Sequence, residues 1–498
     1  MLLRVQSRIG LTSAARFFWH VLWLPVEFFT QRSGGELSTR VAINDRVAAL
    51  LSGDLAHAFL DVAKALFFAL LMFSYDMVLS LIAIAMVTAN LALTRMVATR
   101  TRETSMKLAL DGGKVMAVIM NGLSIMETIK SNGSEAGFFE KWAGYQAKYL
   151  HSEQQLARVG FVLQVVPPLL FAINGLLVLG IGGLRVIDGH LSIGMLVAFQ
   201  SLVASFTEPA GRLATLSNKI QEADGDMKRL DDVMRYPPDP WATTVPLVPV
   251  DGRALRPKIE GFLDMENVTF GYNRAQYALI EGFSMRVKPG QRVAIVGPSG
   301  CGKSTISKLI MGLYPVWEGG IRFDGRPREE YARYEYSNSV ALVDQDIVLY
   351  EGTVRDNLTL WDTSINDTDL IQAAKDAQIH DMILVRQGGY DSLIEEGGRN
   401  MSGGQRQRIE LARALATNPR ILVLDEATSA LDAATEQLVD DALRRRGCTC
   451  VIIAHRLSTI RDCDEIIVMS HGHIVERGRH EALMAIDNGF YQRLMRSG

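Results

Sequence analysis

Four long apolar runs in the first half of the chain constrain its fold more than any other feature. A bilayer core of about 30 Å needs roughly 17 to 25 mostly apolar residues in each spanning helix. A single run could also be a buried helix of a soluble protein, but four runs in two tight hairpins favour membrane spans. The sequence therefore predicts an all-α transmembrane helical domain whose four spans cover about 55–73, 77–97, 159–180 and 191–206.

Basic residues give these spans an orientation. Arg185 is the only lysine or arginine in the two hairpin turns, 74–76 and 184–190. Cytoplasmic loops are enriched in Lys and Arg, so we expect the connection after the second span to face the cytoplasm. With four spans, the first 50 residues and the second half of the chain then lie on that side too. The basic residues of this connection are Arg95, Arg100, Arg102, Lys107 and Lys114.

The membrane half carries three further features. The connection 99–158 is too long for a plain loop and predicts two helices with a turn at 131–137. Asp61 and Lys64 lie three residues apart on one helix face. Two interpretations stay open for them: a role in a transport pathway, or a place near a helix end where they pair with each other. Pro167 and Pro168 predict a kink in the third span.

Composition changes after about residue 225. A proline-dense stretch, 236–257, breaks any helix and predicts a linker, and the remainder alternates like a soluble α/β protein. The net charge of -3, without a block of basic residues, argues against nucleic acid as a partner. All four cysteines, Cys301, Cys448, Cys450 and Cys463, lie in this half, where a reducing cytoplasm disfavours disulfides. For Cys448 and Cys450, strand packing is favoured over metal binding.

A phosphate-binding loop follows the apolar strand 292–296. The segment GPSGCGKS, which fits the Walker A pattern, lies between that strand and a predicted helix. Backbone N–H groups of such a loop converge on phosphate oxygens, Lys303 neutralises the terminal phosphates, and Ser304 can ligate Mg²⁺. The nucleotide-binding residues predicted here are Gly297, Pro298, Ser299, Gly300, Cys301, Gly302, Lys303, Ser304 and Thr305.

Polar residues follow two further apolar strands. Asp425 and Glu426 come at the end of the strand in ILVLDEATSALD. Asp425 is placed to hold Mg²⁺, and Glu426 to polarise the attacking water. The strand in TCVIIAH ends in His455, for which a γ-phosphate contact is favoured over an incidental position.

The segment NMSGGQRQRIELARAL, 400–415, distinguishes this chain from other P-loop proteins. Ser402, Gly403, Gly404 and Gln405 open an amphipathic helix, whose N-terminus is a second anion-binding element. The segment resembles the signature sequence of ABC ATPases, with Met401 where leucine is usual. That resemblance implies an ATP-binding cassette over 259–498, preceded by a linker, 226–258, and a partial exporter-type membrane domain, 1–225.

The resemblance also implies roles for other residues and an assembly. Tyr272 is similar to the aromatic that stacks on adenine, Gln345 to the residue that joins the catalytic core to the membrane domain and can also ligate Mg²⁺, and 429–432 to the loop at the dimer interface. Two cassettes would enclose ATP and Mg²⁺ between the Walker A loop of one and the signature of the other. We therefore expect a homodimer in the lipid of a bacterial cytoplasmic membrane, with two cytoplasmic turns, near 25–36 and 131–145, resting on the cassettes.

Exporters of this kind have six spans, whereas four are predicted here, so the resemblance implies that the chain lacks the first span and most of the second. The segments 31–51 and 394–405 resemble bacteriocin or leader-peptide exporters. A peptide is therefore the expected substrate, and a lipid or drug is the alternative. A chain that binds and hydrolyses ATP at the membrane without transporting anything is the other open interpretation.

Overall fold

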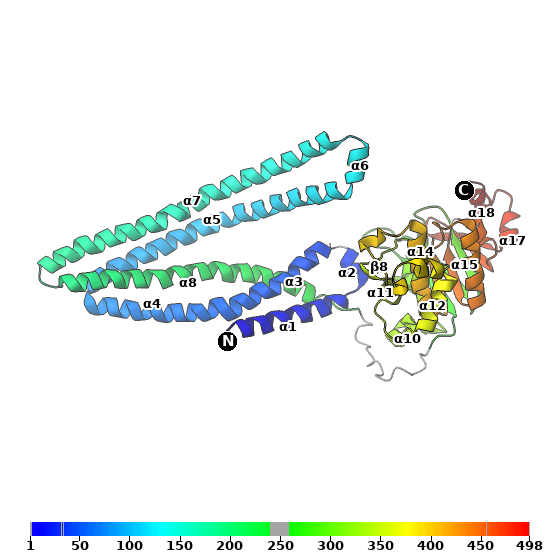
Figure 1. Ribbon diagram of the computed structural model, residues 1–498, viewed down its shortest axis with the longest axis horizontal. Coiled ribbons are helices and arrows are strands. Elements are labelled where there is room, and N and C mark those ends of the chain that lie inside the picture. The colour runs from blue at the N-terminus through cyan, green and yellow to red at the C-terminus, as the bar shows by residue number, and fades with distance from the viewer. Residues whose placement is uncertain (1, 31, 33, 240–257, 455, 498) are drawn as a thin grey trace. The chain divides into compact units, whose positions relative to one another are not determined.

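The computed structural model describes the chain apart from residues 1, 31, 33, 240–257, 455 and 498 (Figure 1). It divides into two compact units, Met1–Leu22 with Gly34–Tyr236, and Trp23–Ser33 with Pro237–Gly498. The first unit is helical, and the second contains β-sheets and helices. The predicted fold class, a helical membrane domain followed by an α/β domain, is confirmed.

Long helices form the first unit. Among the described residues, four stretches are long and apolar enough to cross a membrane, Arg40–Tyr75, Met77–Val97, Glu135–Ile187 and Ile193–Leu213. Met72, Val178 and Phe199 belong to the apolar core where α4, α5, α7 and α8 meet. The elements are α1 (Leu2–Leu22), α3 (Gly34–Ala49), the π-helical segment η1 (Leu50–Asp54), α4 (Leu55–Tyr75), α5 (Met77–Ser124), α6 (Met126–Ser131), α7 (Glu135–Ile187) and α8 (Ile193–Met234).

The connections between these helices are shorter than the sequence suggests. Asp76 alone separates α4 from α5, and its Oδ1 accepts hydrogen bonds from the N–H groups of Val78 and Leu79, both at 2.9 Å. This cap satisfies the first N–H groups of α5, so no longer turn is needed. The turn expected at 131–137 reduces to 132–134, because α7 begins at Glu135. α8 begins at Ile193, two residues after the predicted start of the fourth span.

The structure shows the surroundings of Asp61 and the course of the helix at Pro167 and Pro168, two features of the predicted spans. Asp61 is 4% exposed and forms an ion pair with Arg212 of α8, with 3.7 Å between Nη1 and Oδ1. Of the interpretations left open for Asp61, pairing with Lys64 is therefore contradicted, because Asp61 contacts Arg212 of α8 while Lys64 is exposed. The helix α7 continues as a single element through Pro167 and Pro168.

A mostly parallel sheet forms the centre of the second unit. Its strand order is β12 (His473–Gly478), β11 (Glu465–Ser470), β3 (Arg292–Val296), β10 (Thr449–Ile453), β9 (Ile421–Asp425) and β6 (Val340–Val343). An antiparallel sheet contains β2 (Ile280–Val287), β1 (Leu263–Phe270), β4 (Glu318–Phe323) and β5 (Arg326–Pro327), and β7 (Gly352–Thr353) pairs with β8 (Leu393–Ile394). The main helices are α9 (Lys303–Ile310), α11 (Val354–Thr359), α12 (Asp367–Asp376), α13 (His380–Val385), α14 (Gly403–Ala416), α15 (Ala433–Arg446) and α18 (Phe490–Ser497).

The register of the parallel strands aligns their carboxyl ends. Ile453 of β10 is paired with Asp425 of β9 on one side and with Ile295 of β3 on the other. Every residue of β3, β9 and β10 is buried, as expected for a sheet covered on both faces. Polar residues that follow these strands therefore meet at one edge of the sheet, where α/β proteins bind ligands.

The short helix α2 (Val26–Thr30) belongs to the second unit although it precedes the membrane spans. Val26 packs against the core of the α/β body, and the guanidinium of Arg333 lies 4.6 Å from the ring centroid of Trp23. The first of the two predicted cytoplasmic turns thus rests on the α/β domain. The second predicted cytoplasmic turn covers 131–145. The short helix near it is α6, which ends at Ser131, where that predicted segment begins.

Candidate functional site

The loop between β3 and α9 has the backbone that a phosphate site needs. Gly300 and Gly302 adopt positive φ angles of 79° and 103°, which glycine reaches without strain. A Cβ on Gly297 would lie 2.3 Å from the carbonyl oxygen of Met469, so no larger residue fits there. The buried Lys303 Nζ donates to the carbonyl oxygens of Gly297, at 2.8 Å, and Pro298, at 3.0 Å. The loop therefore surrounds an ammonium group at the start of a helix.

Aromatic residues lie beside the start of α9. Tyr272 is 54% exposed, and its hydroxyl is 3.2 Å from Oγ1 of Thr305. Its ring meets those of Phe270 and Tyr314 edge to face, with centroids 5.3 Å apart in both cases. An exposed aromatic ring is thus packed next to the phosphate loop, a position that allows it to stack on a base.

Asp425 ends β9 close to the phosphate loop. The residue is 1% exposed, and the Ser307 hydroxyl donates to its Oδ2 at 3.2 Å. Burial raises the pKa of Asp425, although the hydroxyls of Ser304 and Ser307 oppose this, and Asp344 and Glu426 add to the increase. Its Oδ1 is buried and accepts no hydrogen bond from the described residues. A buried carboxylate oxygen without a donor, beside a serine hydroxyl, fits the oxygen ligands that Mg²⁺ prefers.

Glu426 is held in an unusual backbone conformation. Its φ of 51° is strained for a residue other than glycine, asparagine or aspartate. The N–H donates to the carbonyl of Ile453 at 2.9 Å, and the side-chain Oε2 accepts from Nε2 of Gln345 at 3.3 Å. Glu426 and Gln345 are therefore brought together at the edge of the sheet.

The signature segment starts α14 through a capping box. Ser402 Oγ accepts from the N–H of Gln405 at 3.3 Å, and Gln405 Oε1 accepts from the N–H of Ser402 at 2.9 Å. Met401 fills a buried position in the core, so it replaces leucine without loss of packing. Gly403 and Gly404 form the first turn of the helix, where backbone N–H groups remain unpaired.

Sequence reasoning did not identify Gln407, which joins this helix to the loop after β9. Its Nε2 donates to the carbonyl oxygen of Glu426 at 2.9 Å and to Ser429 Oγ at 3.3 Å, and its Oε1 accepts from the N–H of Ala430 at 2.8 Å. The only signal in the sequence is a polar residue on the buried face of an amphipathic helix. Gln407 is thus a positioning residue for Glu426.

His455 lies outside the described residues. The next residue, Arg456, supports the same loop, because its guanidinium donates to the carbonyl oxygens of Ser429, at 2.7 Å, and Leu431, at 3.0 Å. An ion pair of 3.1 Å with Glu436 fixes it to α15. Arg456 therefore contacts Ser429 and Leu431 in the loop 429–432, which the resemblance assigns to a dimer interface.

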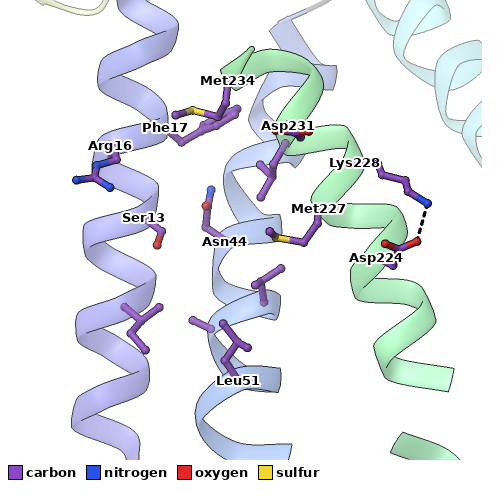
Figure 2. Close-up of a pocket in the computed structure, with 14 residues that line it drawn as sticks. Ser13, Arg16, Phe17, Asn44, Leu51, Asp224, Met227, Lys228, Asp231 and Met234 are labelled. Carbon is purple, nitrogen blue, oxygen red and sulfur yellow. Dashed lines mark hydrogen bonds and ion pairs between the residues drawn. The ribbon is translucent and has the colours of Figure 1, made fainter. Parts of the chain in front are cut away.

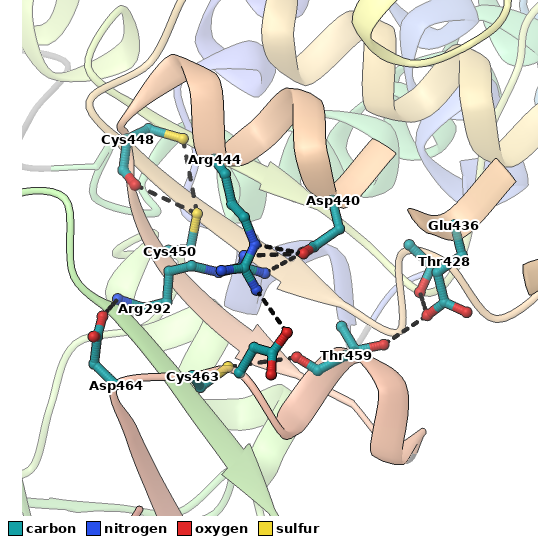
Figure 3. Close-up of polar contacts among 11 residues, drawn as sticks. Arg292, Thr428, Glu436, Asp440, Arg444, Cys448, Cys450, Thr459, Cys463 and Asp464 are labelled. Atoms are coloured by element: carbon teal, nitrogen blue, oxygen red, sulfur yellow. Dashed lines mark hydrogen bonds and ion pairs between the residues drawn. The ribbon is translucent and has the colours of Figure 1, made fainter. Parts of the chain in front are cut away.

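Cys450, in β10, and Cys448, just before that strand, lie in a polar cluster at the end of the sheet opposite the phosphate loop (Figure 3). Cys450 is buried, with its Sγ 3.7 Å from that of Cys448. Arg292 forms an ion pair with Asp440 of α15, and Nη1 lies 3.2 Å from Oδ2. Burial raises the pKa of the Cys463 thiol to about 11. The ion pair joins β3 to α15, which is a structural role.

A cavity of about 600 Å³ lies in the membrane unit between α1, α3 and α8 (Figure 2). Its walls are mainly apolar, and Lys228 and Asp224 form an ion pair of 2.7 Å at its side. The lining residues include Ile9, Ser13, Phe17, Asn44, Leu51, Met227 and Met234. The cavity is within this unit and shares no residue with the phosphate loop.

The fold and the phosphate loop place this chain in the class of P-loop ATPases joined to a helical membrane domain. Family models for "ABC transporter" and "ABC transporter transmembrane region" match residues 280–429 and 2–210. The chain belongs to the ABC transporter family, with the membrane domain fused to the cassette as in exporters. It is an ATPase, and it couples ATP binding to transport across a membrane.

Similar proteins align over almost the whole chain. It is 33% identical over 494 residues to the exotoxin translocation ATP-binding protein PaxB of Pasteurella aerogenes. It is 32% identical over 491 residues to the cyclolysin secretion/processing ATP-binding protein CyaB of Bordetella pertussis. Each alignment covers 98% of this chain and 68% of the relative. The structure of a bacterial Atm1-family ABC exporter with ATP bound matches with a TM-score of 0.83 at 27% identity, over 99% of this chain and 86% of that chain.

Proposed function

We propose that this chain is the subunit of a homodimeric exporter that uses ATP to move a polypeptide out through a bacterial cytoplasmic membrane. One observation carries the proposal: alignments to proteins named for toxin translocation and secretion cover 98% of the chain, so the similarity includes the membrane half. The proposed cargo is therefore a polypeptide, a class that includes proteins as well as the bacteriocin or leader peptide expected from the sequence.

The proposed chemistry divides the site residues by role. The N–H groups of 297–305 and the ammonium of Lys303 bind the phosphates, and Tyr272 stacks on the adenine. Mg²⁺ would be held by Ser304, Asp425 and Gln345, and would neutralise charge on the phosphates. The Glu426 carboxylate accepts a proton from the attacking water. His455 is proposed to contact the γ-phosphate.

A second copy completes the site in this proposal. The capping box of α14 pairs the N–H groups of Ser402 and Gln405 and leaves those of Gly403 and Gly404, in the first turn of the helix, available to an anion. ATP held between Lys303 of one copy and 402–405 of the other would have a helix N-terminus on both sides. Because each chain carries Glu426 and His455, both sites of a homodimer can hydrolyse ATP.

The test compares the polypeptides that an organism secretes. The gene is deleted from the organism that carries it and restored as wild type or as Glu426→Gln, and the culture medium is analysed by mass spectrometry. Polypeptides that disappear on deletion should return with the wild type and stay absent with Glu426→Gln. A change confined to lipids or small molecules would support the alternative cargo, and an unchanged medium would support a membrane ATPase without transport.

A further inference from the structure

Two cysteine thiols face each other at the start of the strand β10, at the end of the sheet opposite the phosphate loop (Figure 3). The Sγ atoms of Cys448 and Cys450 are 3.7 Å apart, and the Cys450 thiol also donates to the Cys448 carbonyl oxygen at 3.5 Å. Only Thr449 separates the two residues, so both side chains lie on one face of the chain. The fold therefore holds two free thiols as a close pair.

The two thiols of this pair are unequal. Cys448 is 7% exposed and Cys450 is 1% exposed. A Cβ on the exposed Gly447 would meet no atom within 4 Å, so the chain is open to solvent just before Cys448. A hydrogen bond from Cys450 lowers the pKa of the Cys448 thiol, although burial opposes this, and the positive charges of Arg446 and Arg292 lower it further. Cys448 is therefore the nucleophile of the pair, and Cys450 is placed to attack it in turn.

A disulfide suits this pair better than a metal ion does. Zinc sites take at least three ligands from the protein. Across the part of the chain that the structure describes, no group of three or more Cys, His, Asp or Glu residues is placed to hold a metal. Disulfides join Cα atoms that are about 4.4–6.8 Å apart, and residues two apart in a strand are separated by about 6.6 Å. The bond can thus form if the start of the strand contracts slightly.

A contraction at this point acts on the contacts of β10 at both of its ends. At the start of the strand, the N–H of Cys450 donates to the carbonyl oxygen of Gln291, just before β3, at 3.0 Å. At its end, the carbonyl oxygen of Ile453 accepts from the N–H of Glu426 at 2.9 Å. Every residue of β10 is buried, and closely packed interiors transmit strain. The thiol pair is therefore connected, through one strand, to the backbone that holds Glu426.

We propose that Cys448 and Cys450 form a reversible disulfide by exchange with a low-molecular-weight disulfide, and that this bond slows ATP hydrolysis. The Cys448 thiolate attacks one sulfur of the small disulfide and displaces the other as a thiolate. The Cys450 thiol then loses its proton and attacks Cys448 Sγ, which releases the second small thiolate. Two electrons pass from the protein to the small disulfide, and the protons of both cysteines end on the two small thiols.

The compartment sets when this exchange occurs. A reducing cytoplasm keeps the pair as thiols, in agreement with the expectation from the sequence. The disulfide forms when the ratio of small disulfide to small thiol rises, because exchange is reversible and follows that ratio. The pair therefore acts as a redox switch on the cassette, separate from the ATP site.

Peptide mass spectrometry tests whether the bond forms. The purified full chain is equilibrated with mixtures of reduced and oxidised glutathione, denatured, alkylated at its free thiols and digested with trypsin. Cleavage after Arg446 and Arg456 places both cysteines in one peptide, 447–456. This peptide should lose two hydrogens and escape alkylation, dithiothreitol should reverse both changes, and Cys463 should remain alkylated throughout. Alkylation of both cysteines in the most oxidising mixture, or a disulfide to Cys463, would overturn the proposal.

Two variants test the order of attack. Valine in Cys450→Val has no thiol to displace the small thiolate, so glutathione should remain bound to Cys448 in this variant. Cys448→Ser retains only the more deeply buried thiol and should take up glutathione at least about tenfold more slowly, because reaction requires an accessible thiolate. Equal uptake at Cys450 in Cys448→Ser would overturn the assignment of the nucleophile.

ATP hydrolysis by the full chain tests the effect of the bond. The kcat of the oxidised wild type should fall at least about fivefold, as expected for the loss of one hydrogen bond, and should recover with dithiothreitol. Cys463→Ala keeps the pair and should lose the same fraction, whereas Cys448→Ser should keep its kcat in the same oxidising buffer.

Cys301 of the phosphate loop is present in every one of these variants, so oxidation of Cys301 would slow all of them alike. An equal loss of kcat in Cys448→Ser would therefore assign the inhibition to another cysteine and overturn the switch. A wild type that contains the disulfide between Cys448 and Cys450 but keeps its full kcat would also overturn it.

Discussion

Replacing Gln407 by leucine should slow ATP hydrolysis while leaving ATP binding nearly intact. The side chain of Gln407 bonds the carbonyl of Glu426 and the N–H of Ala430, at 2.9 and 2.8 Å. Leucine has a similar size but no polar group, so both backbone groups lose their partner. The strained φ of 51° at Glu426 then loses one of the contacts that holds it.

The magnitude follows from the exposure of the two groups. A buried backbone group left without a partner costs about 1–3 kcal/mol. Ala430 is exposed, so water can replace the lost acceptor, and the lower part of this range applies, about 1–2 kcal/mol in total. If this free energy is lost entirely from the stabilisation of the transition state, kcat decreases about 5- to 30-fold.

The assay is steady-state ATP hydrolysis by the purified full chain, with nucleotide affinity measured separately. Gln407→Glu keeps the acceptor for Ala430 but places a carboxylate against the Glu426 carbonyl, so it should lose as much or more activity. Gln372→Leu, which removes a glutamine bonded to Asp376 on α12, is the control and should keep the wild-type kcat. A wild-type kcat in Gln407→Leu would refute the positioning role.

Three further predictions concern the phosphate loop and the sheet. Lys303→Ala should weaken ATP binding at least tenfold, as titration of the nucleotide would show, because the ammonium lies inside the loop; unchanged affinity would count against the loop as the ATP site. Gly297→Ala should also lose ATP binding, since the added Cβ meets the Met469 carbonyl at 2.3 Å, and normal affinity would show that the loop can shift freely. Arg292→Met should destabilise the full chain to thermal unfolding by about 2 kcal/mol at neutral pH, because it removes a partly buried partner of Asp440. Burial opposes ionisation of Asp440, but bonds from Arg292 and Arg444 lower its pKa overall, so its stabilisation is present above the unfolded pKa and disappears as the pH falls through the lowered value. Thermal unfolding followed below about pH 4 should therefore depend less on pH in Arg292→Met than in the wild type, and equal pH dependence would contradict this reading.

Local patterns in the sequence predict the features that depend on short spacings. The phosphate loop, the acidic pair after β9 and the start of α14 each occupy fewer than about ten residues, and their chemistry is set by residue type and order. The apolar runs predict the membrane helices for the same reason, because the length and apolar composition of a continuous segment decide whether a helix can span the bilayer.

Contacts between distant residues could not be predicted in this way. The partner of Asp61 is Arg212, on a helix far along the chain, whereas the nearest opposite charge in the sequence is Lys64. Gln407 reaches Glu426 only because α14 packs against the end of β9. The turn predicted at 74–76 is a single residue in the structure, because the carboxylate of Asp76 caps α5. This is a local effect that the sequence could have indicated.

The most direct measurement of the central claim compares Glu426→Gln with the wild type in ATP binding and hydrolysis by the purified full chain with Mg²⁺. Glutamine has nearly the same shape but cannot accept a proton from water. The account predicts that the variant binds ATP with wild-type affinity, loses hydrolysis by at least a hundredfold and accumulates as an ATP-bound dimer. Hydrolysis by Glu426→Gln at the wild-type rate would contradict it.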